Sequence, residues 1–258
     1  MKVQSLVLWL PFILTNAGLA AGSLQVQSPV RTNNIGRFRR TTGGHVSHWV
    51  LRIMKGNDFV CGAAYISALY AVTSANCLHR YRLDLSALRV QLLKEEPEEP
   101  PFVGVSAIYV PKMWQSTHMD VAVVQLSARL SGSRNDFARL CSKPMSLNDT
   151  VEVVACGKEV QVATISIMDT KECASQYENL LSITVACGQE FTRTETCMFE
   201  AGCPVSAGEE LCGIVAGSPS TCQKKLPGIL TDLYRAREFV QKVISSENKV
   251  SKRSKMNR

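Results

Sequence analysis

Short segments rich in apolar residues dominate the middle of the chain. They are rich in Val, Ile and Tyr and are separated by Gly, Pro, Asn and charged clusters, a pattern typical of β-strands. The predicted strands are residues 46–53, 60–73, 88–93, 102–109, 120–126, 151–155, 160–167, 211–216 and 228–233. Many short strands of this kind indicate an all-β fold, built as barrels or as a sandwich.

Two segments have helical character instead. Residues 169–181 begin with Asp169 and Thr170, which can cap a helix N-terminus. Residues 234–246 carry an apolar stripe at helical spacing, formed by Phe239, Val240, Val243 and Ile244. The acidic, proline-flanked stretch 95–101 predicts a surface loop at a strand junction, not a linker between independent domains.

The first 22 residues have the parts of a secretory signal peptide. Lys2 precedes an apolar run at residues 6–14, and small residues follow at positions 17–22. A membrane anchor is the alternative, but the run is short and lacks a basic stop-transfer flank. No internal apolar run reaches the roughly 18 residues that a spanning helix needs. We therefore expect a signal peptide at residues 1–22 and a secreted, extracellular protein without a transmembrane anchor.

The ten cysteines all lie between Cys61 and Cys222. An even number in a secreted chain predicts five disulfides. A zinc site would need closely spaced cysteines or a Cys/His cluster, and no two cysteines here are that close, so we expect neither metal nor cofactor. The triplet at residues 148–150 makes Asn148 a candidate N-glycosylation site.

The net charge of +7 is concentrated at the two ends. Residues 23–40 contain four Arg and no acidic residue, and residues 247–258 contain five basic residues against Glu247. Together with Lys2, these ends hold more positive charge than the whole chain, so the body at residues 41–246 is slightly acidic. The C-terminal segment predicts a disordered basic tail. It would attract polyanionic glycans, although a solvated, cleavable end is the favoured alternative.

Several ordered motifs resemble those of chymotrypsin/trypsin-like serine proteases. Residues 61–67 (CGAAYIS) and 71–77 (AVTSANC) are similar to the family's Cys-Gly-Gly and Leu-Thr-Ala-Ala-His-Cys segments. Residues 120–126 (DVAVVQL) resemble Asp-Ile-Ala-Leu-Leu-Lys-Leu, and residues 197–204 (CMFEAGCP) stand where the family has Cys-Gln-Gly-Asp-Ser-Gly-Gly-Pro. The resemblance covers residues 41–246. It implies two six-stranded antiparallel β-barrels packed face to face, a C-terminal helix and an active-site cleft between the barrels.

The catalytic positions of that family are altered. Asn76 stands at the histidine position and Ala201 at the serine position, while Asp120 remains. Alanine has no nucleophile, and an amide is not a general base near neutral pH. His118 or His79 could be a displaced base, but no displaced nucleophile accompanies them, and we favour surface histidines. The sequence therefore predicts a protein that is not an enzyme, and Asn76 could instead hydrogen-bond the buried carboxylate of Asp120.

The resemblance also locates the neighbouring subsites. Phe199 replaces an oxyanion-hole glycine and should crowd the hole or reorient its peptide. Glu195, Ser218 and Gly228 fall at specificity-pocket positions. An acidic floor at Glu195 would suit a basic peptide residue, but we favour a collapsed pocket with an exposed glutamate.

A processing site is expected near the start of the body. Residues 40–44 stand where the family has its zymogen cut, and residues 37–40 also fit a furin-type site. Cleavage after Arg40 is as well supported as its absence. The new amine at Thr41 would then pair with Glu200, as the resemblance implies.

The resemblance implies three disulfides: Cys61–Cys77, Cys173–Cys187 and Cys197–Cys222. Compared with the usual family pair, Cys156 is shifted four residues later and Cys203 four residues earlier. Because equal and opposite shifts keep residues of antiparallel strands opposed, we expect Cys156–Cys203 and hence Cys141–Cys212. A link between Cys203 and Cys212 would overturn both.

The favoured function is that of a secreted, inactive serine protease homologue of the insect type that binds an extracellular protein. Its partner would be a protease or a protease substrate, in an immune or reproductive-fluid cascade. One alternative is a protein that binds polyanions or surfaces through its basic ends, and another is a nonstandard endopeptidase. A decoy for protease inhibitors is disfavoured because residues 199–203 depart from the family, and nucleic acid is disfavoured because no basic-aromatic motif occurs.

Overall fold

A computed structural model describes eight segments of the chain, all within the compact unit Phe38–Arg258. The segments are residues 46–93, 102–115, 118–130, 137–157, 161–177, 181–190, 199–216 and 226–256. The predicted signal peptide, the segment 23–40 and six predicted site residues lie outside them: Arg40, Thr41, Glu195, Cys197, Ser218 and Cys222. In the described part of the chain, no helix is both long and apolar enough to cross a membrane.

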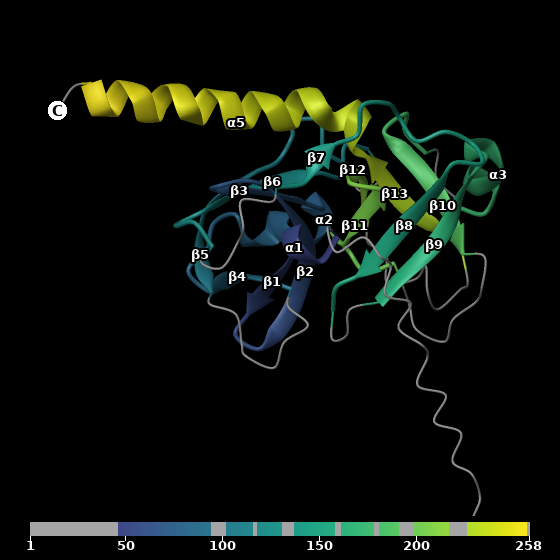
Figure 1. The fold of residues 1–258 in the computed structure, drawn as a ribbon, viewed down its shortest axis with the longest axis horizontal. Helices are drawn as coiled ribbons and strands as arrows, with labels where there is room; N and C mark the ends of the chain where they lie inside the picture. The colour runs from purple at the N-terminus through teal and green to yellow at the C-terminus, as the bar shows by residue number, and fades with distance from the viewer. Residues whose placement is uncertain are drawn as a thin grey trace, which may run out of the picture. The chain divides into compact units, whose positions relative to one another are not determined.

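Six antiparallel strands form a first closed barrel, in the order β1-β2-β3-β6-β5-β4 (Figure 1). These strands are β1 (Val50–Lys55), β2 (Asp58–Ser67), β3 (Tyr70–Thr73), β4 (Leu88–Leu92), β5 (Val103–Tyr109) and β6 (Ala122–Leu126). The short helices α1 (Val46–Trp49), α2 (Ala75–Leu78) and η1 (His79–Tyr81) lie before β1 and after β3. Closure leaves no unpaired strand edge in this barrel.

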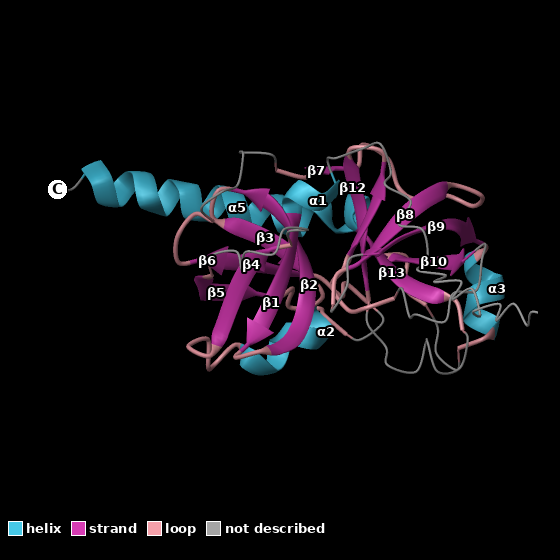
Figure 2. Ribbon diagram, turned by 60° about the horizontal axis from the view of Figure 1, so that its bottom comes forward, coloured by secondary structure: helices cyan, strands magenta, loops and turns pink. Residues whose placement is uncertain are grey.

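A second group of strands forms a sheet in the order β11-β8-β9-β10-β13-β12-β7, and the pairing of β11 with β12 closes six of them into a barrel (Figure 2). These strands are β7 (Arg139–Leu140), β8 (Thr150–Ala155), β9 (Gln161–Met168), β10 (Val185–Glu190), β11 (Pro204–Ala207), β12 (Glu210–Val215) and β13 (Gly228–Asp232). Strand β7 is the addition, and it runs parallel to β12. The prediction of two six-stranded antiparallel barrels is confirmed.

Two longer helices accompany the second barrel. Helix α3 (Thr170–Ser175) begins after Asp169, whose Oδ1 accepts hydrogen bonds from the N–H groups of Lys171 and Glu172, as the cap prediction requires. Helix α5 (Leu233–Met256) follows β13 directly, and Asp232 caps it by accepting the N–H of Tyr234 at 3.0 Å. Its contacts with β7, β12 and β13 attach the C-terminal helix to the second barrel.

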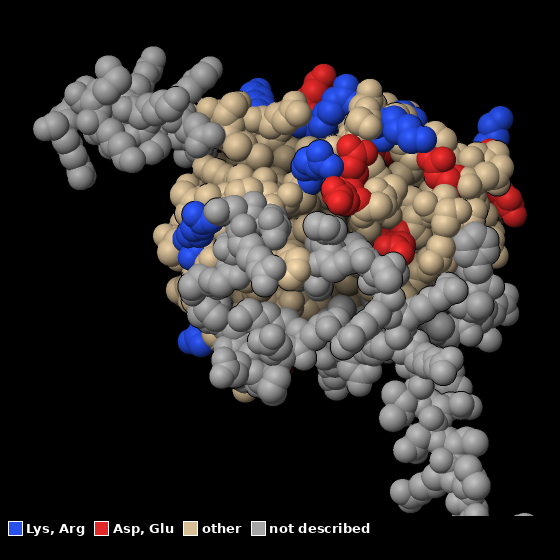
Figure 3. Space-filling view, viewed as in Figure 1, with Lys and Arg blue, Asp and Glu red and all other residues tan. Residues whose placement is uncertain are grey.

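The described surface carries charges of both signs. On the face seen in Figure 3, Lys and Arg side chains lie among Asp and Glu side chains across the upper part of the molecule. One exposed ion pair joins Arg139 Nη2 to Glu209 Oε2 at 3.3 Å. Exposed pairs of this kind contribute at most about 1 kcal/mol, so the fold must be held mainly by its core.

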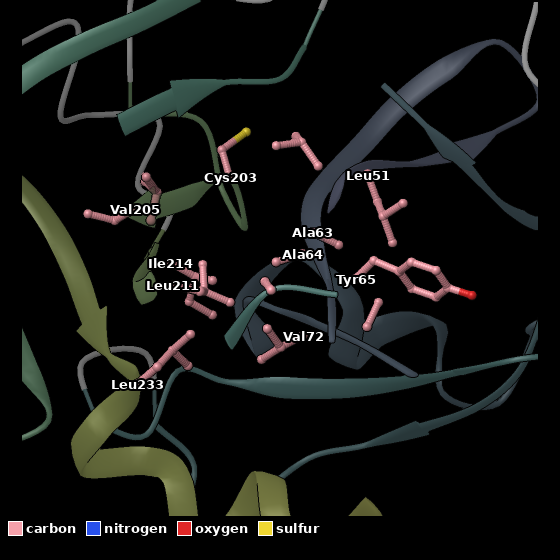
Figure 4. Packing of buried hydrophobic residues seen from close by; sticks show 14 of the residues in the cluster. Leu51, Ala63, Ala64, Tyr65, Val72, Cys203, Val205, Leu211, Ile214 and Leu233 are labelled. Carbon is pink, nitrogen blue, oxygen red and sulfur yellow. The ribbon is translucent and has the colours of Figure 1, made fainter. Parts of the chain in front are cut away.

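One hydrophobic cluster runs through both barrels. Leu51, Tyr65 and Val72 enter it from the first barrel, and Val205 and Ile214 enter it from the second (Figure 4). All five side chains are fully buried. Each such side chain contributes about 1.5–3 kcal/mol on removal from water, so the two barrels share one stabilising core.

The structure corrects several strand boundaries. Residues 46–49 form α1 instead of the start of a strand, since the first pair of β1 is Val50 with Ala64 and nothing pairs with the residues before it. The predicted strand 60–73 is the hairpin β2–β3, whose turn contains no Gly, Pro or Asn to mark it. Strands β7, β10 and β11 were not predicted, because they are short or flanked by segments without alternation.

Both helix predictions needed correction in length. Helix α3 ends at Ser175 instead of residue 181, where the N–H of Gln176 turns back to Cys173 O at 3.0 Å and closes a tighter last turn. Helix α5 extends to Met256, past the predicted helix end at residue 246, while the prediction of a basic disordered tail at residues 247–258 stays a prediction. No Gly or Pro interrupts residues 233–256, so no residue there ends the helix.

Four disulfides join the described cysteines, none of which is free. The pairs are Cys61–Cys77, Cys141–Cys212, Cys156–Cys203 and Cys173–Cys187. They are the pairs expected from the resemblance and from the shift argument. The fifth expected pair, Cys197–Cys222, lies outside the described residues.

Two glycines allow the barrels to approach each other. A β-carbon on Gly62, in β2, would collide with the sulfurs of the Cys156–Cys203 disulfide in the second barrel. Gly202, just before β11, has φ of +77°, and a β-carbon there would collide with Gly62 O, Thr73 Oγ1 and Cys61 Sγ of the first barrel. Each glycine therefore faces a cysteine sulfur of the opposite barrel, where no side chain fits.

We expect Gly202→Ala to lower the free energy of unfolding by about 3–5 kcal/mol, from positive-φ strain and collision with backbone that cannot move. Gly208→Ala is the matched control: Gly208 has φ of +59° but open space around it, so only the conformational cost of about 1–2 kcal/mol applies. Urea unfolding with the disulfides intact measures both. Equal losses would contradict a tight barrel junction at Gly202.

Candidate functional site

The three positions that the resemblance assigns to the protease triad lie where the two barrels meet. Asn76 is in α2, directly after β3, and Asp120 is two residues before β6. Ala201 is in the turn that precedes β11 of the second barrel, and its carbonyl O accepts a hydrogen bond from Gly62 N at 2.8 Å. The pairing of β3 with β6 and this single backbone bond bring the three segments together.

The carboxylate of Asp120 is buried and fully engaged. Its Oδ2 accepts a hydrogen bond from Ser74 Oγ at 2.7 Å, and its Oδ1 accepts one from the backbone N–H of Asn76 at 2.7 Å. Burial raises the pKa of Asp120 above its ordinary value, and the hydrogen bonds from Ser74 and Asn76 oppose that rise. Thr231 Oγ1 in the second barrel also donates to Asp120 O at 3.0 Å, so the aspartate ties both barrels.

The predicted contact of Asn76 with Asp120 occurs, but its main donor differs from the expectation. The bond of 2.7 Å comes from the peptide N–H of Asn76, which any residue at this position would supply. The side-chain amide makes the smaller contribution to holding the carboxylate ionised. Ser74 was missed from the sequence, although a serine beside a buried carboxylate is a typical donor.

The Phe199 ring occupies space next to the specificity-pocket position Gly228. Phe199 is only 9% exposed and belongs to the common core. A β-carbon on Gly228 would collide with three atoms of the ring. The space beside Gly228 is therefore filled by the Phe199 ring, while the role of Gly228 in a specificity pocket stays a prediction. The expectation that Phe199 crowds the oxyanion hole stays a prediction, while Glu195 and Ser218 lie outside the described residues.

Glu200, the predicted partner of a new N-terminus, has other partners. Its Oε2 accepts hydrogen bonds from the N–H groups of Cys156 at 2.9 Å and Gly157 at 2.6 Å. Arg52 Nε donates to Cys156 O at 2.7 Å; burial lowers the pKa of Arg52, and attraction to Glu200 opposes that shift. Arg52 was missed, although a cation flanked by apolar residues within the strand VLRIMK signals a buried partner. Pairing of Glu200 with Thr41 stays a prediction.

The two histidines near the triad positions make contacts of their own. His118 Nδ1 and Ser182 Oγ are 2.7 Å apart, and that hydroxyl also accepts a hydrogen bond from Thr184 N. The exposed His79 stacks on Trp114, with ring centroids 4.6 Å apart. Among the contacts of the described residues, none joins either histidine to the carboxylate of Asp120 or to Ala201.

Two further places bear on glycosylation and on metal binding. Asn148 lies in the turn before β8 with φ of 67°. Its side chain is exposed and therefore accessible to modification, and its glycosylation stays a prediction. Among the described residues, Cys156, Glu200 and Cys203 form one compact group of metal-ligand types. Both cysteines are in a disulfide and cannot offer thiolates, so this group does not fit a metal ion.

A double-mutant cycle tests the contact between Phe199 and Gly228. We expect Phe199→Ala to lower the unfolding free energy by about 3–5 kcal/mol through loss of a buried ring. Gly228→Ala alone should cost about 1–3 kcal/mol through collision. In the double variant the collision is gone, so the combined loss should fall below the sum by about 1 kcal/mol or more.

The matched control pairs Phe199→Ala with Gly104→Ala. A β-carbon on Gly104 would meet Ser127 Oγ at 3.2 Å and not the ring, so these two losses should add. Additive losses in the Phe199/Gly228 cycle as well would show that the ring does not fill this space in solution.

The comparisons with known proteins agree with this architecture. Residues 35–240 match the family model described as Trypsin. Seminase of Drosophila melanogaster is 22% identical over 226 residues, covering 81% of each chain, and trypsin iota of the same species is 26% identical over 213 residues, covering 77% of this chain and 84% of that one.

Solved structures share the fold. The scabies mite inactivated protease paralogue S-I1 has a TM-score of 0.66 at 22% identity, covering 78% of this chain and 96% of that chain. Kallikrein-related peptidase 10 has a TM-score of 0.65 at 18% identity, with the same coverage. Since the family model spans most of the sequence, this chain belongs to the trypsin-like serine protease family.

Proposed function

We propose that this protein is a secreted serine protease homologue that does not cleave peptides and acts by binding another extracellular protein. The observation that carries the proposal is the chemistry beside Asp120: the family's histidine position holds Asn76 and its serine position holds Ala201. A serine attacks and a histidine accepts its proton in this mechanism, so both reacting groups are missing. Loss of either one in a related triad costs about 10⁶-fold in rate.

The filled space at Gly228 supports the same proposal. A substrate side chain would have to displace the Phe199 ring, which is buried in the common core. Breaking that packing would cost about 1.5–3 kcal/mol before any contact with substrate formed. The scabies mite relative is described as an inactivated protease paralogue, which is consistent with a protease fold kept without the activity.

A two-barrel protein without peptidase activity can still act by binding a protease or the substrate of a protease. The two barrels, their four described disulfides and the Asp120 network hold a rigid surface without any need for catalysis. Two D. melanogaster relatives are consistent with a protein of the insect type, and we propose an immune or reproductive-fluid cascade as its setting.

The first test is reactivity with a fluorophosphonate probe and with a panel of peptide substrates. We expect the purified protein to show neither labelling nor turnover, because it has no nucleophile beside Asp120. An active trypsin serves as the positive control. The variant Asn76→His/Phe199→Gly/Ala201→Ser restores the family residues and is expected to gain labelling. Saturable turnover by the natural protein that disappears in a folded Asp120→Asn variant would overturn the proposal.

The second test is capture of a partner from the native extracellular fluid, followed by the same probe. Because the bait itself should not be labelled, a labelled band identifies a captured active serine protease, the expected result. The control bait carries Lys249, Lys252, Arg253 and Lys255 changed to Gln, which keeps the length of α5 and removes its basic end. Capture lost in the control would assign binding to the tail and contradict docking through the barrels.

A further inference from the structure

A cavity of about 700 Å³ lies on the first barrel and is separate from the triad positions. It is formed where the turn between β1 and β2, the helix η1 and the start of β4 meet. Its lining includes Lys55, Asp58, Phe59, Arg80, Tyr81 and Arg89. Ligand sites in proteins usually have volumes of about 300–1,000 Å³, so this cavity has the size of a binding site.

The charge in this cavity is strongly one-sided. Lys55, Arg80 and Arg89 come from three different elements and converge on it, against the single lining carboxylate of Asp58. The ion pairs in the described segments join other residues, Arg139 to Glu209 and Arg235 to Asp232. The three cations therefore have no described acidic partner, whereas charges of both signs are mixed on the face in Figure 3.

Aromatic rings hold these cations in place. Lys55 Nζ and Arg80 Cζ lie 5.6 and 4.8 Å from the centroid of the Tyr81 ring, and Arg89 Cζ lies 5.8 Å from that of Phe102. Each contact stabilises the cation by about 0.5–1 kcal/mol at an exposed site. A contact with a ring face leaves most N–H donors of the cation available, so the cavity presents ordered donors for anionic oxygens.

The closed first barrel argues against one alternative occupant, an acidic peptide bound as an added strand. An acidic peptide that binds as an added strand needs an unpaired strand edge, and the first barrel is closed. A sulfated sugar chain is recognised through side chains alone, with its sulfates on separated cations. The basic ends of the chain would add long-range attraction for the same polymer.

We propose that this cavity binds a sulfated oligosaccharide, with sulfate groups on Lys55, Arg80 and Arg89. The sugar rings occupy the space beside Phe59 and Tyr81. The site uses none of the residues at the triad positions, so it is independent of the protein's reactivity toward peptides and of its protein partner.

The test is calorimetric titration of the full chain with a heparin-type sulfated hexasaccharide at about 0.15 M salt, where charges farther apart than about 8 Å are screened. The variant Lys55→Gln/Arg80→Gln/Arg89→Gln should bind about tenfold more weakly or worse, since a charge-assisted hydrogen bond contributes roughly a factor of ten. The control Lys112→Gln/Lys143→Gln/Lys171→Gln removes three exposed cations outside the cavity and should change affinity by less than about threefold. Circular dichroism checks that both variants fold.

Each other result overturns the proposal. Equal weakening in both variants would mean general attraction by positive charge. Equal binding of the desulfated hexasaccharide would mean that sulfate is not recognised. Inorganic sulfate that binds as tightly as the hexasaccharide would mean an isolated anion site. An acidic hexapeptide that binds as tightly, with the same loss in the cavity variant, would mean that the cavity is a peptide site.

Discussion

The junction of the two barrels around position 201 depends on one backbone hydrogen bond and the two glycines beside it. Gly62 N donates to Ala201 O at 2.8 Å, which fixes the turn before β11 against β2. On one side Gly62 faces the Cys156–Cys203 disulfide, and on the other Gly202 faces Cys61 Sγ. This arrangement requires a small residue at both glycine positions but makes no demand on the side chain of residue 201. Alanine can therefore replace a nucleophile there without disturbing the packing.

The same separation of structure from chemistry applies to Asp120 and Asn76. The buried carboxylate needs donors, and it receives them from Ser74 Oγ and from the peptide N–H of Asn76. Replacing the Asp120 side chain would leave these two donors unsatisfied in the interior, at a cost of about 1–3 kcal/mol for each. Thr231 donates to the backbone carbonyl of Asp120 and would keep its partner. The position of Asn76 carries no comparable structural demand, since its principal contact is made by the backbone.

Much of the fold could be predicted from the sequence because strand-forming residues and helix caps are local signals, as the cap at Asp169 shows. The pairing of Cys156 with Cys203 was predicted instead from the family resemblance and the shift argument. The strand β11 could not be found this way, since its position depends on pairing with β8 and β12 far along the chain. For the site, the identities at positions 76, 120 and 201 were readable, but the partners of Glu200 and the direction of the Phe199 ring arise only from tertiary packing.

The Phe199 ring gives a physical link between the proposed loss of peptidase activity and the filled space beside Gly228. An open pocket leaves apolar surface hydrated, and filling it with a buried ring contributes about 1.5–3 kcal/mol to folding. An enzyme must forgo this stabilisation to bind substrate. Under the proposed function no substrate has to enter, so packing alone decides which side chain occupies the space beside Gly228. Binding of a partner molecule then has to use surface outside this region. The cavity on the first barrel offers such a surface, because its Lys and Arg side chains form none of the ion pairs found among the described residues.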